Sequence, residues 1–185
     1  MKNSRVVYVL IGPRGAGKSQ YAKKLAAEQP ELQVVSRDEI LVRLFGSEHC
    51  DRYSGGHHLA LEEMNLKLRQ ILSATGAVSV VLDTWTGDSA ERKYLIRELR
   101  DLGATRIVAL YFVTPLDHVV EWFWKKPGIA KISEYHSRQG QGLVFHLEDT
   151  PRRDYKLFHK LASEIESDGF NKVIRIDPTQ QTLAL

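Results

Sequence analysis

Eight consecutive residues near the start of the chain have the types and spacing of a phosphate-binding loop. The pattern G-x-x-x-x-G-K-[ST] is met in full by Gly12, Pro13, Arg14, Gly15, Ala16, Gly17, Lys18 and Ser19. Glycines let a backbone curl so that several N–H groups point at one phosphate chain. The lysine charge suits the β- and γ-phosphates, and the serine hydroxyl suits Mg²⁺. The motif therefore predicts binding of a nucleoside triphosphate, which we expect to be ATP with Mg²⁺, and it gives Lys18 a catalytic role.

The sequence on either side of this motif supports the prediction. Residues 5–11 (RVVYVLI) are β-branched and almost wholly apolar, as expected for a strand buried on both faces. Residues 18–29 then carry apolar positions at helical spacing. A phosphate loop belongs between a buried strand and a helix, because the positive end of the helix dipole then faces the phosphates. The alternative, a glycine-rich turn without a ligand, does not require this placement.

Two carboxylates follow predicted strands and are candidates for the chemistry. Asp38 comes after the strand at 32–35, and Asp83 ends the strand at 78–82. In a parallel sheet both would lie at the carboxyl edge, beside the phosphate loop. There Asp38 could act as the general base that takes the proton of an attacking hydroxyl, and Asp83 could ligate Mg²⁺ together with Ser19. The alternatives are that Asp38 caps the following helix and that Asp83 is an ordinary turn carboxylate.

The remaining chain alternates short apolar runs with helical patterns, which predicts a parallel sheet with helices on both faces. Further strands are expected at 106–113 and 170–176, and further helices at 37–45, 57–73, 89–102, 116–124 and 151–167. Residues 125–149 contain glycines and no sustained period, so we interpret them as a mobile loop region. We expect one domain over residues 1–185, with a three-layer α/β fold.

In this order the motifs resemble the polynucleotide-kinase type of P-loop kinases. The resemblance combines the phosphate loop with Val-Ser-Arg-Asp38-Glu, Val-Leu-Asp83-Thr84 and Asp168-Gly-Phe-Asn. It implies a five-stranded sheet of order 2-3-1-4-5 and a lid over ATP, formed by residues of about 125–149. It also implies transfer of the γ-phosphate to a hydroxyl with Asp38 as base. A polynucleotide 5′-hydroxyl is one candidate acceptor. The Asn-Lys-x-Asp guanine reader of GTPases is missing, and Thr84 replaces the acidic residue that motor ATPases usually carry after this aspartate.

The acceptor half of the predicted site departs from that family. The family often places an arginine where Leu41 stands, and lid arginines where Trp122 and Lys126 stand. Lysine does not reproduce the planar, bidentate grip of arginine on phosphate. Two alternatives therefore stay open, a kinase for a small metabolite, nucleoside or sugar, and a non-catalytic ATP-binding regulatory protein. Candidate substrate and lid residues are Arg37, Arg43, Thr84, Lys125, Lys126 and Arg138.

The amino-acid composition excludes few further classes of protein. The 185 residues are 43% hydrophobic with a formal net charge of +3, so an anionic partner is neither demanded nor opposed. Cys50 is the single cysteine, so no internal disulfide can form. No apolar run approaches the length of a membrane span. We expect a cytoplasmic protein with no membrane partner.

Overall fold

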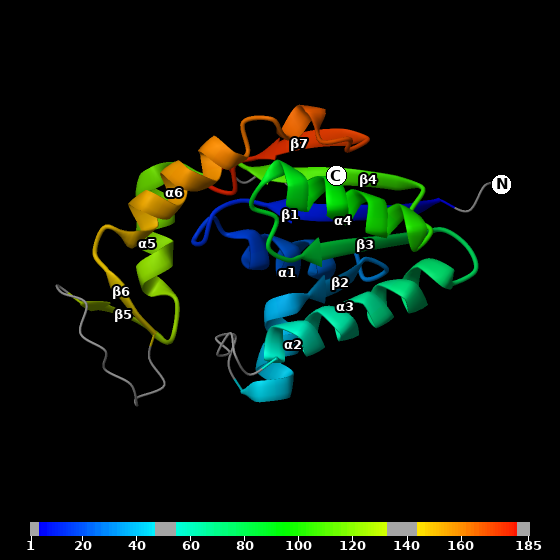
Figure 1. Cartoon of the computed structure of the whole chain (residues 1–185), viewed down its shortest axis with the longest axis horizontal. Coiled ribbons are helices and arrows are strands. Elements are labelled where there is room, and N and C mark those ends of the chain that lie inside the picture. The colour runs from blue at the N-terminus through cyan, green and yellow to red at the C-terminus, as the bar shows by residue number, and fades with distance from the viewer. Residues whose placement is uncertain (1–3, 47–54, 133–143, 181–185) are drawn as a thin grey trace.

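The computed structural model describes residues 4–46, 55–132 and 144–180, and in these ranges strands and helices alternate (Figure 1). The strands are β1 (Arg5–Ile11), β2 (Gln33–Ser36), β3 (Val78–Asp83), β4 (Arg106–Phe112), β5 (Ile129–Ile132), β6 (Val144–Leu147) and β7 (Lys172–Ile176). The helices are α1 (Lys18–Glu28), α2 (Arg37–Phe45), α3 (Gly56–Ser73), α4 (Ser89–Asp101), α5 (Leu116–Lys125) and α6 (Thr150–Leu161), with a 3₁₀ turn at Ile165–Ser167.

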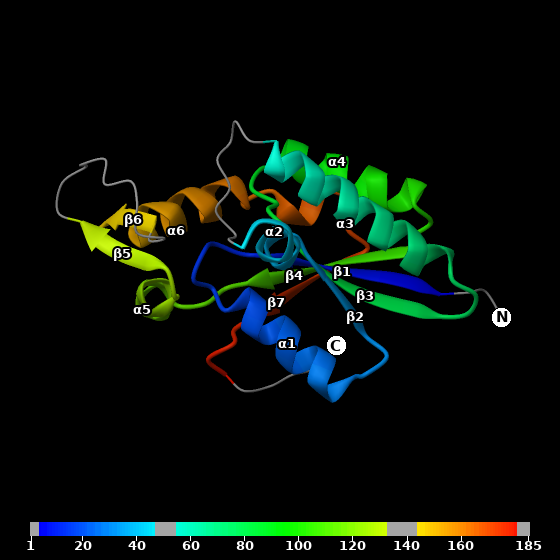
Figure 2. The ribbon, with the colours of Figure 1, turned by 90° about the horizontal axis from the view of Figure 1, so that it is seen from below.

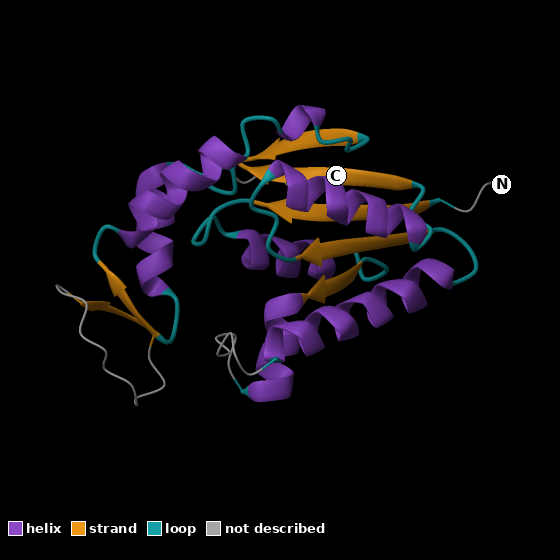
Figure 3. Cartoon of the chain, viewed as in Figure 1, coloured by secondary structure: helices purple, strands orange, loops and turns teal. Residues whose placement is uncertain are grey.

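Five of the strands form one parallel sheet in the order β2-β3-β1-β4-β7. Because β7 is the fifth strand of this sheet along the chain, the predicted α/β fold and order 2-3-1-4-5 are confirmed. All five strands point the same way, so their carboxyl ends share one edge (Figure 3). Helices α5 and α6, with the two-stranded sheet β5-β6, lie beyond that edge.

Alternate residues of β1 enter two separate cores, which is why the strand is apolar throughout. Val7, Val9 and Ile11 pack in a core with apolar residues of α3 and α4. Leu10 packs in the other core, with Tyr21 and Leu25 of α1. Figure 2 shows the corresponding layers, with α3 and α4 on one face of the sheet and α1 on the other.

The structure corrects the sequence prediction in two places. Part of the region interpreted as a loop at 125–149 forms the parallel pair β5-β6, in which Ile129 lies opposite Val144. Strands of four residues beside glycines carry too little pattern to be recognised. The helix expected to run to residue 167 ends at Leu161, and the 3₁₀ turn follows it. In the described ranges, no helix combines the length and the apolar character that crossing a bilayer requires.

Candidate functional site

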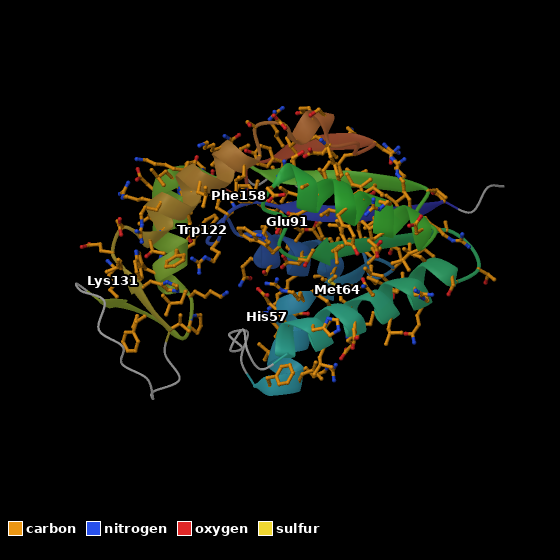
Figure 4. All side chains as sticks on the ribbon, in the orientation of Figure 1. His57, Met64, Glu91, Trp122, Lys131 and Phe158 are labelled. Carbon is orange, nitrogen blue, oxygen red and sulfur yellow. The ribbon has the colours of Figure 1, made fainter. Side chains whose placement is uncertain are left out.

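An open cleft of about 1140 Å³ lies at the carboxyl edge of the sheet. The phosphate loop, the start of α2 and the end of β3 form its floor, and residues of α5 and α6 form a wall. Figure 4 shows Trp122 and Phe158 on that wall, with His57 at the start of α3 across from them. Ligands of open parallel sheets bind outside the carboxyl ends of the strands, so this is the expected location for a binding site.

The phosphate loop has the backbone that its glycines permit. Gly15 and Gly17 have φ values of 82° and 84°, in the left-handed region where other residues are strained. The loop is also packed against α5, because a Cβ on Gly15 would lie 2.5 Å from the carbonyl oxygen of Val119. The buried hydroxyl of Thr114, two residues after β4, donates to the carbonyl of Ala16 at 2.8 Å and holds the loop in place. The glycines are therefore needed for the loop conformation and for its packing.

Lys18 lies at the centre of the charged groups. Its ammonium donates to the carbonyls of Gly12 and Pro13 at 2.9 and 3.0 Å, so it is folded back along the loop. Burial lowers the pKa of Lys18 from its ordinary value, while the carboxylates of Asp83 and Asp38 oppose that shift. A cation that has lost water and faces two carboxylates is well placed to bind an anionic phosphate chain.

Ser19 and Asp83 form a pair of oxygen donors beside Lys18. The Ser19 hydroxyl donates to Oδ2 of Asp83 at 2.8 Å, and Asp83 is 9% exposed at the end of β3. In the described ranges no cluster of three His, Cys, Asp or Glu side chains could hold a metal by itself. Mg²⁺ prefers oxygen ligands and is usually held by one or two protein groups together with substrate phosphates, so this pair fits it. The Mg²⁺ role of both residues stays a prediction.

Asp38 lies beside this pair because of the strand register. Ser36 pairs with Asp83 across β2 and β3, so Asp38 is only two residues beyond the paired position. The side chain of Ser36 caps α2 by accepting from the backbone N–H of Glu39, so Asp38 is not the capping residue. Its carboxylate accepts from Arg37 at 3.1 Å, and both residues line the cleft. Asp38 therefore lies in the first turn of α2 and lines the cleft.

The structure brings most of the other predicted residues to the cleft. Thr84, Lys125 and Lys126 line it together with the whole phosphate loop. Arg43 does not, because it points to α3 and forms an ion pair with Glu63, while Leu41 on the same helix is fully buried. Arg138 lies outside the described residues.

Several contacts of cleft residues, and the position of Trp85, were not predicted from the sequence. Arg14 of the phosphate loop donates from Nε to Oδ2 of Asp154 on α6 at 2.9 Å, which joins the loop to the far wall. Trp122 packs over the loop, since a Cβ on Gly17 would lie 2.9 Å from its ring and 3.5 Å from Pro178. Trp85 also lines the cleft. No local sequence pattern predicts these contacts, because the residues that form them come from distant parts of the chain.

A parallel sheet of this order with a phosphate loop between β1 and α1 defines a P-loop NTPase-like α/β protein, and that class implies nucleotide binding. A sequence model described as an AAA domain matches residues 7–144, and the chain belongs to this family. A search of curated protein sequences finds no significant match.

Solved structures of similar fold have low sequence identity to this chain. A candidate kinase from Chloroflexus aurantiacus is 13% identical with a TM-score of 0.61, over 98% of this chain and 91% of that one. A tunicamycin resistance protein from Deinococcus radiodurans is 18% identical with a TM-score of 0.57, over 97% and 89%. A fungal RNA kinase is 15% identical with a TM-score of 0.55, over 98% and 78%. At these identities the similarity establishes the fold alone.

Proposed function

We propose that this protein is an ATP-dependent kinase that transfers the γ-phosphate to a hydroxyl of its substrate. The observation that carries the proposal is the convergence of Lys18, the Ser19–Asp83 pair and Asp38 at one end of one cleft. A nucleotide-binding protein without transfer activity would need Lys18, Ser19 and Asp83, but it would not need the second carboxylate, Asp38. Two proteins of similar structure are described as kinases, which agrees with this class of reaction.

In the proposed reaction the substrate hydroxyl binds beside Asp38, which accepts its proton. The hydroxyl oxygen forms a bond to the γ-phosphorus while the bond from that phosphorus to the β,γ-bridging oxygen breaks, and ADP leaves. Lys18 turns from its loop carbonyls to the phosphates and stabilises the charge on the moving group. When bound, Mg²⁺ would neutralise charge on the β- and γ-phosphates, with Ser19 and Asp83 as its protein contacts. Lys125 and Lys126, at the start of the proposed lid, would add positive charge.

The alternative acceptors are not equally supported. Leu41 is fully buried and Arg43 is paired with Glu63, so neither offers the phosphate contact expected of the polynucleotide-kinase type. These two observations favour an acceptor that the protein recognises without an ion pair between Arg43 and a phosphate of the acceptor. A nucleoside or another small hydroxyl compound meets that condition, and so does the terminal nucleoside of a nucleic acid.

The test is transfer of label from γ-labelled ATP, in the presence of Mg²⁺, to oligonucleotides with a 5′-hydroxyl, to nucleosides and to sugars. Label appearing in an acceptor, dependent on Lys18, would support the proposal. ATP binding without transfer to any acceptor in the panel would overturn it and would favour a nucleotide-binding regulatory protein.

A further inference from the structure

An exposed aromatic side chain lines the cleft that also contains Asp38. Trp85 is 49% exposed although it lines the cleft. It follows Asp83 by two residues, just as Asp38 follows Ser36 by two, and Ser36 and Asp83 are register partners. Trp85 and Asp38 therefore follow neighbouring strands at the same edge of the sheet, and both line the cleft. Trp122 is a separate feature, because it lies over Gly17 of the phosphate loop.

The surface around Trp85 is apolar. Its ring meets Phe158 of α6 edge to face, with ring centroids 6.3 Å apart. Leu157, which is 56% exposed, and Leu161 line the same cleft from α6. Exposed apolar side chains gathered inside a cleft favour a ligand with an apolar face. A bare sugar would turn hydroxyls toward these leucines without hydrogen-bond partners, whereas the flat face of a nucleobase would not.

The ring of Trp85 is held in position by what lies behind it. A Cβ on Gly87 would lie 2.6 Å from Cζ2 and 2.8 Å from Nε1 of Trp85, so the ring occupies the space that glycine leaves. The carbonyl of Gly87 accepts from Nη1 of the buried Arg92 at 2.7 Å, which fixes the loop. The ring of Trp85 is therefore held in one position, although one side of it is exposed to the cleft.

We propose that Trp85 determines acceptor specificity by stacking on an uncharged nucleobase attached to the sugar whose hydroxyl is phosphorylated. This inference rests on the proposed kinase function and names the substrate class of the same site. The base can belong to a free nucleoside or to the 5′ end of a nucleic acid. Base–aromatic stacking is removed by alanine and largely kept by phenylalanine.

The kinetic test compares adenosine with 1,4-anhydroribitol, which has the same 5-hydroxyl but no base, as acceptors for labelled ATP. We expect the wild type to prefer adenosine in kcat/KM, and Trp85→Ala to reduce that preference by about 5- to 150-fold. Trp85→Phe should keep most of it, and Gly87→Ala should lower it by displacing the ring. Trp124→Ala is the matched control, since Trp124 packs on Phe123 and is not among the cleft residues. Equal use of both acceptors by the wild type, or equal loss for both in Trp85→Ala, would overturn the inference.

A binding measurement separates this inference from the proposed function. Adenosine is titrated calorimetrically into protein whose nucleotide site is filled with a non-hydrolysable ATP analogue. Binding that Trp85→Ala weakens, without transfer to any acceptor, would refute the kinase while keeping the stacking site. Transfer to the base-free acceptor, without adenosine binding that depends on Trp85, would support the kinase and refute the stacking site. A 5′-hydroxyl dinucleotide identifies the source of the base, because a higher kcat/KM than adenosine indicates a nucleic-acid end and a lower one a free nucleoside.

Discussion

Arg92 is expected to be the costliest polar side chain to remove from this protein. It is 0% exposed, and its Nε lies 2.5 Å from Oδ2 of Asp168, whose side chain is also fully buried. Its other nitrogens donate to the carbonyls of Gly87 at 2.7 Å and Leu161 at 3.0 Å. One guanidinium thus joins the loop after β3 to the end of α6 and to the residue before Gly169.

The expected cost follows from what Arg92→Leu would leave behind. The carboxylate of Asp168 would keep the hydroxyl of Ser89 as a partner but would be buried without its counter-charge. Breaking one side of a buried ion pair typically costs about 3–5 kcal/mol, because the remaining charge has lost both water and partner. For a protein of this size that corresponds to a fall in Tm of about 6–20 °C.

The assay is urea unfolding followed by circular dichroism, with Arg97→Leu as the control on the same helix. Arg97 is exposed and stacks on Tyr94, so its loss should cost at most about 1 kcal/mol. The double variant Arg92→Leu, Asp168→Leu should recover part of the lost stability, because no unpaired charge remains. A loss below about 1 kcal/mol for Arg92→Leu would refute this account of the pair.

Three further predictions concern the phosphate loop and a half-buried histidine. Gly15→Ala should reduce ATP affinity, measured by calorimetry, at least about tenfold and should destabilise the fold more than Gly46→Ala. Both glycines have positive φ, but only at Gly15 would an added Cβ clash, so equal destabilisation by the two substitutions would contradict this prediction. Lys18→Met should abolish the ATP-induced rise in Tm without lowering the free energy of unfolding of the free protein at pH 7, since burial lowers the pKa of Lys18 and disfavours its charge; a less stable free protein would count against it. Burial also lowers the pKa of His159 below its ordinary 6.5, so the folded state binds fewer protons and stability should fall as the pH drops from 6.5 toward the folded pKa. His159→Gln should flatten that part of a urea-unfolding pH series, and an unchanged slope would refute the assignment.

The sheet and the donor side of the site could be predicted because their signals are local in sequence. The buried strand, the glycines and the start of α1 are consecutive from Arg5 to Ser19. Asp83 directly follows an apolar run, and Asp38 comes three residues after one. In a parallel sheet this adjacency is enough to place Asp83 beside Ser19, which the 2.8 Å hydrogen bond bears out.

The acceptor side could not be predicted in the same way. Trp85 owes its place to Gly87, Arg92 and Phe158, and the partners of Arg92 are as distant as Asp168. Arg43 looked available in the sequence, but its helix turns it toward Glu63. Such outcomes depend on how α3, α4 and α6 pack, and no short motif encodes that packing.

The central claim is that Asp38 removes the proton of the acceptor hydroxyl, and a single-turnover measurement tests it most directly. Phosphoryl transfer from saturating ATP is timed for the wild type, for Asp38→Asn, and for Glu39→Gln as the exposed neighbour on α2. We predict that Asp38→Asn slows transfer by about 10²- to 10⁴-fold with ATP affinity nearly unchanged, and that Glu39→Gln behaves as the wild type. Transfer by Asp38→Asn at the wild-type rate would contradict the mechanism.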